Sequence, residues 1–440
     1  VYDDIPMSLR RAFHRQVARG FAAAGREAST VAAHVALGAD KGDREAVDWL
    51  VRAADELGRG TIGAIRVGAE TVAHTDLLLR GAELCGEDDD RRFEILARAL
   101  LGLTVTYRCA EAETLARSLL ADDALPADLE PVVRHGLANA LSLLGRESEA
   151  RDEWRTIREL TATSVILRNH ASSELAMSSA LSGEVEDAER LADEALAHAS
   201  EHDHPWPPCQ ALMTKSLVAA ARGRVNEAIE RGREAIPLAD RDFELGGGLS
   251  GARLFTGLAL VEADRIEEGE AEVRVDYGRA RRDHLGRSSV EREIGLAAID
   301  YIRGTWDDAL VEMGSALSFD VDERLELFVG LGILARIHLH RGEVAPASEA
   351  LDRADRELAA FGPGVGLDLV LWCRGLMRRQ DGDLDEALAL LELAWQGTAG
   401  ARYAFGIWRH TWPDLVSVAL EVGRSDLVSD VVAAARQGAR

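Results

Sequence analysis

The sequence predicts an all-α fold, a superhelical solenoid of about ten helical hairpins. Three observations support this prediction. The 440 residues are 47% hydrophobic but only 5% aromatic, and this composition favours helices over a β-sandwich. A short turn motif recurs every 38 to 41 residues along most of the chain. Small residues recur at fixed distances on both sides of this motif, as expected of stacked structural repeats.

Composition also limits the function. The chain has 51 Lys and Arg against 76 Asp and Glu, and a formal net charge of -25 repels phosphate backbones, so we expect no direct contact with nucleic acid. Its 4 cysteines show no CxxC spacing, which excludes a disulfide framework and a zinc site and points to a cytoplasmic location. No apolar run is long enough to span a membrane and no signal peptide opens the chain, so we expect no membrane partner.

The turn motif predicts the hairpins. A glycine, or an aspartate in one copy, ends one helix in a left-handed conformation, and acidic residues then open the next helix at its positive dipole end. The eight copies begin at Gly145, Gly183, Gly223, Asp264, Gly304, Gly342, Gly382 and Gly423.

Two columns of small residues accompany the turns. Seven residues before each turn stand Ala138, Ala176, Ser216, Gly257, Ala297, Ala335, Gly375 and Val416, at the point where two helices must cross closely. Twelve residues after the turns stand Ala195, Ala235, Ala316, Ala354, Ala394 and Ala435, with Ile157 and Asp276 as exceptions. The pattern resembles the tetratricopeptide repeat, although a period near 40 exceeds the usual 34 residues of that repeat.

The repeats are not uniform along the chain. We expect eight tetratricopeptide-like repeats over 126–440 and degenerate helical repeats over 59–125, where Gly60–Ala64 and Tyr107–Ala110 look like eroded turns. Residues 1–58 are predicted to be a helical connector without an obvious repeat.

The connector suggests a family. Three stretches, Tyr2–His14, Val31–His34 and Ala46–Ala54, resemble the segment that joins the ATPase module to the repeat domain in large ATP-binding regulators of the LuxR family. The resemblance implies a preceding ATPase module that uses ATP and magnesium, a middle sensor domain and a following helix-turn-helix module. Because the chain begins at Val1, we expect it to be the excised sensor.

Neither flanking activity is expected within the chain itself. Lys41 is followed by Gly42, and Lys215 lacks the preceding glycines of a Walker A motif, so we assign no nucleotide site and no cofactor. The last helix is predicted to complete a hairpin, so DNA recognition would need a further segment. No pattern of paired carboxylates, or of a nucleophile with its base, stands out, so we expect no enzyme activity.

Two local patterns that could bind an ion have simpler structural explanations. His198, His202 and His204 with Asp203 are spaced to share a metal ion, but a solvated linker after a helix end is the favoured interpretation. The glycine-rich stretch Gly246–Gly251 precedes a helix and could hold an anion, yet no strand precedes it, so a linker between hairpins is again favoured.

The remaining candidate site is the concave groove, lined by the first helix of each hairpin. The residues projected onto it are His135, Asn139, His170, Ser173, Glu174, Met177, Gln210, Met213, Thr214, Phe255, Arg336 and Trp372. This mixture suits a small-molecule inducer or an extended peptide, although any one of these side chains could instead pack against a neighbouring helix. The sequence therefore favours an inducer sensor that signals to its own ATPase and DNA-binding modules. The alternative is a scaffold for a partner protein or peptide, and self-association is also compatible with the pattern.

Overall fold

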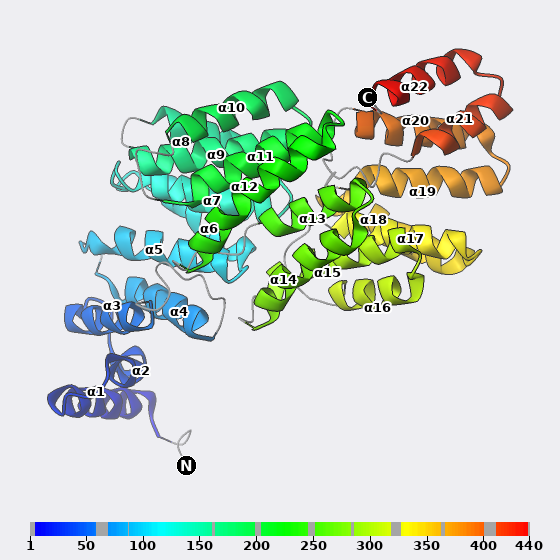
Figure 1. The fold of residues 1–440 in the computed structure, drawn as a ribbon. Coiled ribbons are helices and arrows are strands. Elements are labelled where there is room, and N and C mark those ends of the chain that lie inside the picture. Colours follow the sequence, from blue (N-terminus) through cyan, green and yellow to red (C-terminus); the bar gives the residue numbers. More distant parts are fainter. Residues whose placement is uncertain are drawn as a thin grey trace.

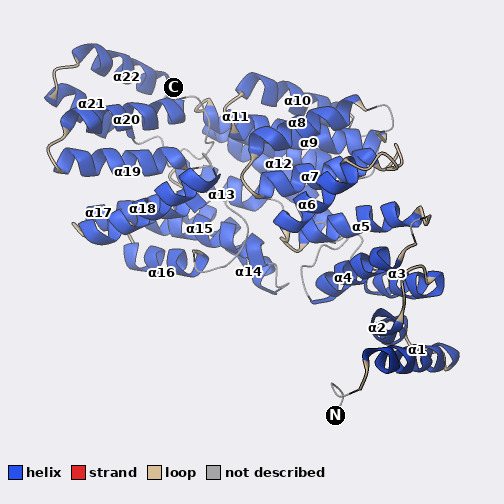
Figure 2. Ribbon diagram, turned by 180° about the vertical axis from the view of Figure 1, so that it is seen from behind, coloured by secondary structure: helices blue, strands red, loops and turns tan. Residues whose placement is uncertain are grey.

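The computed structural model describes residues 5–58, 69–86, 88–160, 163–198, 204–244, 251–282, 286–317, 327–361, 366–399 and 411–438. Within these ranges the chain is helical and has no strand, as Figure 2 shows. The expected all-α, tetratricopeptide-like solenoid is confirmed. The expected features at Gly60–Ala64, at His202 and Asp203, and at residues 246–250 lie outside the described residues.

Twenty-two helices follow one another along the described chain, and successive pairs form hairpins (Figure 1). The helices are α1 Met7–Ala23, α2 Ala28–Gly38, α3 Arg44–Gly58, α4 Ala69–Leu84, α5 Arg91–Val105, α6 Cys109–Leu120, α7 Glu130–Leu143, α8 Glu147–Glu159, α9 Val165–Leu181, α10 Val185–Ala197, α11 Trp206–Ala221, α12 Val225–Glu244, α13 Ala252–Glu262, α14 Ile266–Arg282, α15 Gly286–Arg303, α16 Trp306–Ala316, α17 Leu327–His340, α18 Val344–Phe361, α19 Leu367–Gln380, α20 Leu384–Ala399, α21 Trp412–Glu421 and α22 Ser425–Gly438. The proposed boundaries at residues 58 and 125 fall at or between helix ends, and the division into three parts stays a prediction.

The predicted turns have one common geometry. The seven turn glycines have φ between 74° and 87°, and Asp264 has φ 61°. At the first turn the Gly145 amide donates to the Ser142 carbonyl and the Arg146 amide donates to the Leu141 carbonyl, both at 2.9 Å, which is a Schellman motif. Tyr107 has φ 59° and the same pattern of hydrogen bonds, so the eroded copy between α5 and α6 keeps the turn although it has lost the glycine.

The first small-residue column lies where the two helices of a hairpin cross. In the α11–α12 hairpin the Ser216 hydroxyl donates to the Ala228 carbonyl at 2.8 Å. In the α13–α14 hairpin both residues at the crossing are glycines: a Cβ atom added to Gly269 would lie 2.4 Å from the Gly257 carbonyl oxygen. The helix backbones therefore touch, and this contact leaves no room for a side chain.

Replacing Gly269 with alanine is expected to lower the free energy of unfolding by about 1–3 kcal/mol, because the new methyl group overpacks a backbone contact. The matched control is Gly314→Ala in α16, where an added Cβ meets no atom within 4 Å. That change should stabilise the protein by about 0.5–1 kcal/mol, since alanine is the better helix former. Urea unfolding of both variants measures the difference; equal effects would show that the crossing is not tightly packed.

Packing between hairpins identifies the inner side of the solenoid. The first helices of successive hairpins touch each other directly, as α9 touches α11 and α17 touches α19. Among the described residues this holds from α5 to α19, and over the same stretch the second helices make no comparable contact with one another. Closely spaced first helices and separated second helices curve the stack toward the first helices, so these line the concave face as the sequence predicts. In Figure 1 the stack rises from the N-terminus to α10, descends through α13 to α16 and rises again through α17 and α19 to α22.

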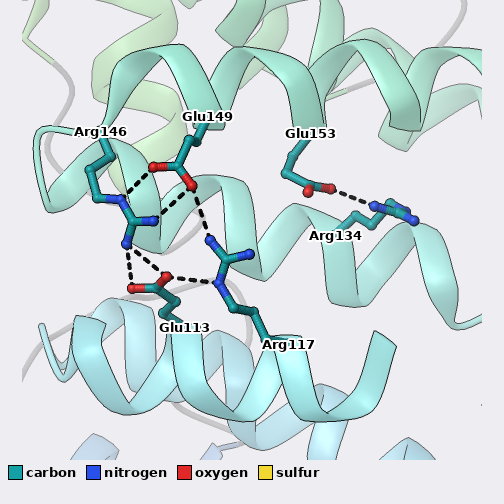
Figure 3. Close-up of polar contacts among 6 residues, drawn as sticks. All are labelled: Glu113, Arg117, Arg134, Arg146, Glu149 and Glu153. Atoms are coloured by element: carbon teal, nitrogen blue, oxygen red, sulfur yellow. Dashed lines mark hydrogen bonds and ion pairs between the residues drawn. The ribbon is translucent and has the colours of Figure 1, made fainter. Parts of the chain in front are cut away.

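Arginine and glutamate side chains tie the turns of neighbouring hairpins together. Arg146 at the α7–α8 turn pairs with Glu113 of α6 at 2.7 Å and with Glu149 of α8 at 2.7 Å (Figure 3). Arg117 contacts the same two carboxylates, at 2.8 and 3.1 Å, so the four charges alternate in a closed ring. The two arginines hold the pKa values of both carboxyls below their usual range. Exposed ion pairs of this kind add little stability one by one, but together they fix the register between hairpins.

Candidate ligand-binding site

Five of the predicted groove residues form one continuous cluster on α7, α9 and α11. On α7, His135 and Asn139 are four residues apart, and the Asn139 amide lies 3.0 Å from His135 Nε2. The His135 ring meets the His170 ring of α9 edge to face, with centroids 4.7 Å apart. These contacts arise because an i, i+4 pair on each helix faces the corresponding pair on the next first helix.

Glu174 is the centre of this cluster. His170 Nε2 lies 3.5 Å from Glu174 Oε1. Gln210 of α11 donates its amide to Glu174 Oε2 at 3.1 Å, and the Trp206 indole N–H donates to Glu174 Oε1 at 2.8 Å. Only 17% of the Glu174 side chain is exposed, and burial raises its pKa to about 7 in spite of both hydrogen bonds. The carboxyl group therefore changes its charge near neutral pH.

Aromatic rings enclose the cluster. The His170 ring stacks on Trp206 with an interplanar angle of 16° and a centroid separation of 6.2 Å. Trp154 of α8 meets the edge of His135 at 5.3 Å. Sequence analysis missed both tryptophans. Trp206 had a usable signal, because it precedes Gln210 by four residues on the same predicted helix face; Trp154 lies on a second helix and gave no such signal.

Two buried polar atoms of the cluster have no hydrogen-bond partner in the described structure: His135 Nδ1 and Gln210 Oε1. Burial lowers the pKa of His135 to about 4 and holds the pKa of His170 well below its usual value, so both rings are neutral. Because His135 Nε2 accepts from the Asn139 amide, the hydrogen-bond network assigns the ring proton to Nδ1. The cluster thus contains one buried unpaired donor, His135 Nδ1, and one buried unpaired acceptor, Gln210 Oε1.

Four other predicted groove residues are buried between the helices instead of lining a surface. Ser173 and Thr214 are fully buried, and their hydroxyls donate to the carbonyls of His170 and Gln210 in their own helices. Met177 and Met213 belong to a hydrophobic core, and the half-buried Phe255 packs against it. The close contact of α9 with α11 covers these positions, so they support the cluster from behind.

The last two predicted residues, Arg336 and Trp372, lie together in a separate cluster on α17 and α19. The Arg336 guanidinium stands 3.9 Å from the centroid of the Trp372 ring. The Trp372 indole N–H donates to Asp414 of α21 at 2.8 Å, and Arg336 donates to the Tyr301 hydroxyl at 3.3 Å. The predicted set therefore divides into two groups, and in the second the charged and aromatic groups satisfy one another.

Other expectations concern metals, thiols and the membrane. All four cysteines are buried thiols, and none of them forms a disulfide. Over the part of the chain that the structure describes, no group of three or more His, Cys, Asp or Glu side chains could hold a metal ion. No helix in that same part is long and apolar enough to cross a lipid bilayer.

Comparisons with known proteins place the fold. No protein-family model and no curated protein matches the chain. Among solved structures, the chain is similar to a Rap protein in complex with competence and sporulation factor, with 12% identity and a TM-score of 0.53 over 86% of this chain and 99% of the Rap chain. A tetratricopeptide repeat protein from Parabacteroides merdae aligns with 11% identity and a TM-score of 0.37 over 63% of this chain and 98% of that one. At this identity the likeness to the Rap structure shows the fold alone, a tetratricopeptide-like helical solenoid.

Proposed function

We propose that this chain is the ligand-sensing domain of an ATP-dependent transcriptional regulator of the LuxR type. The observation that supports the proposal most directly is the cluster around Glu174, where unpaired polar atoms and aromatic rings meet on the concave face. An inducer binds this cluster, and the signal passes to an ATPase module and a helix-turn-helix module in the same cytoplasmic protein. The resemblance of residues 1–58 to the connector of such regulators favours this family. The proposed role of the chain itself is non-catalytic.

Signalling follows from where the cluster lies. Its residues come from three successive hairpins; the second helix of each packs on the first helix of the next, and α9 also touches α11 directly. A ligand held by α7, α9 and α11 together stabilises the one arrangement of these helices in which all its contacts form. The solenoid has two arrangements, with and without these contacts, and the ligand favours the one that it binds more tightly. The two arrangements differ in curvature, and the flanking modules respond to that curvature.

A second function has its own support. The similar Rap protein was captured with a bound factor, and the same fold here can serve as a scaffold for a partner protein or peptide in a signalling protein that has no DNA-binding module. In that case the Glu174 cluster holds a segment of the partner. Self-association through the ends of the array is a further interaction that this scaffold permits.

One pair of measurements separates the two functions. The gene is read on both sides of this segment, and the purified chain is screened by thermal shift against a metabolite mixture. A Walker A motif before Val1, a helix-turn-helix after Arg440 and a saturable rise in melting temperature are the results expected for the sensor. A gene without these motifs, together with a partner protein that binds the wild-type chain and not a Glu174→Gln variant, would replace the sensor by the scaffold.

A further inference from the structure

The charge environment of Glu174 differs from that of its neighbours. Several nearby carboxylates are matched with arginine: Glu153 pairs with Arg134 at 2.7 Å, and the ring around Arg146 is fully paired (Figure 3). Glu147 is held by the hydroxyls of Ser142 and Ser178 instead. Glu174 is more buried than most of them, yet its described contacts are a tryptophan N–H, an amide and a neutral histidine. A buried carboxylate without a cation is costly unless something else compensates it.

The groups around Glu174 suit a cation from outside the chain. The Trp206 and His170 rings stack on each other and point nitrogen-bearing edges at the carboxylate. The aromatic surface at the site is the face of Trp206 that is turned away from His170, and aromatic faces attract ammonium and guanidinium groups. Trp206 is half-buried, so the cluster stays in contact with solvent on the concave side. The net charge of -25 draws cations toward the surface of the protein.

The two unpaired atoms indicate what carries this cation. Gln210 Oε1 needs an N–H donor and His135 Nδ1 offers a proton to a carbonyl oxygen. A peptide group supplies both an N–H and a C=O, whereas a simple amine supplies only donors. Both residues are linked to Glu174. The Gln210 amide nitrogen lies 3.1 Å from Glu174 Oε2, and the His135 ring packs against the His170 ring beside Glu174.

We propose that the Glu174 cluster binds a basic side chain of an extended peptide, with the cation against Glu174 and Trp206 and the adjoining peptide group on Gln210 and His135. This inference rests on the proposed ligand-binding function of the groove and names the class of ligand. The peptide bridges α7, α9 and α11, the three helices that provide these residues.

Binding depends on pH through Glu174, whose pKa lies at about 7. The titratable groups that face it are Glu147 of α8, His135 and His170, and His204 beside α11 acts on His170. The buried histidines stay neutral above pH 6, so the charge of the site follows Glu174 over this range. A cation binds the ionised carboxylate, and its affinity therefore rises between pH 6 and pH 8.

The test uses acetyl-Ala-Arg-Ala-amide and its citrulline counterpart, which has the same shape but no charge, with the full chain in isothermal titration calorimetry at pH 8. The arginine peptide should bind at least about tenfold more tightly than the citrulline peptide. The preference should disappear in Glu174→Gln and remain in Glu186→Gln, an exposed position on α10. For wild type, the preference should shrink at pH 6.

Two results would overturn the proposal: equal binding of the two peptides, or no saturable binding of either one. Agmatine carries a guanidinium group but no peptide group, so it tests whether the peptide group contributes to binding. If agmatine binds as tightly as the arginine peptide, the assignment of a peptide ligand is wrong. The comparison of the arginine and citrulline peptides uses the wild-type chain, so a folding defect in a variant does not affect its result. If a metabolite raises the melting temperature of both wild type and Glu174→Gln, the proposed sensor function is retained and only the assignment of a basic peptide as the ligand is rejected.

Discussion

Replacing Arg292 with alanine should lower the free energy of unfolding by about 3–5 kcal/mol. Arg292 of α15 is fully buried, and its guanidinium donates to Asp276 of α14 at 3.0 and 3.2 Å. Asp276 is itself only 3% exposed, so removal of the arginine leaves a buried carboxylate without its cation. Urea unfolding at pH 8, where the carboxylate is ionised in the unfolded chain, measures the loss.

The double variant Asp276→Ala with Arg292→Ala tests the cause. Asp276 is the polar exception in the column twelve residues after the turns, and Arg292 stands twelve residues before its own turn, where other hairpins have Ala171, Ala211 and Ala252. One buried ion pair thus replaces the contact of small residues made elsewhere between hairpins. The double variant restores alanine at both positions and should be more stable than Arg292→Ala alone, with a coupling energy of about 2 kcal/mol or more. Additive losses would mean that the two charges do not depend on each other.

Asp368→Asn should stabilise the protein at pH 8 by about 2–4 kcal/mol and have little effect near pH 4.5. Asp368, in the first turn of α19, is only 3% exposed, and neither of its carboxyl oxygens has a hydrogen-bond partner in the described structure. Burial raises its pKa from 3.8 to about 7, against a lowering effect of the backbone amides of Leu369 and Asp368, which lie too far away or at too poor an angle to count as hydrogen-bond partners. Because the pKa of Asp368 is higher in the folded than in the unfolded chain, its contribution to stability is fully present below pH 3.8 and is lost as the pH rises through 7. Asparagine does not ionise, so the stability of the variant does not fall over this range.

Thermal unfolding across pH 4.5 to 8.5 gives the measurement. Asp430→Asn, at an exposed position on α22, is the control and should follow the wild-type curve. Glu174 and Glu312 also have pKa values raised to about 7 by burial, so a smaller decline with pH should remain in the Asp368 variant. Parallel curves for wild type and Asp368→Asn would show that Asp368 is not the group whose ionisation destabilises the fold.

The sequence alone determined the class of fold and the position of the turns. A left-handed turn residue, the acidic residues after it and the small residues seven positions before it are local signals, and their repetition eight times made each copy a check on the others. The structure finds the left-handed conformation at every one of these turns, including Asp264. The helical periodicity also placed His135, His170 and Glu174 on the same face of successive first helices, because that face depends only on spacing along each helix.

Only the tertiary structure decided which of these side chains meet and which are covered. The contacts of Trp206 with Glu174 and of Arg292 with Asp276 join different helices, and they depend on how far one hairpin is shifted and rotated against the next. That offset is set by the summed packing of whole helices and not by any short pattern. For the same reason Ser173 and Thr214 had the spacing of groove residues but are buried where α9 meets α11. The sequence defined each hairpin, and packing between hairpins defined the site.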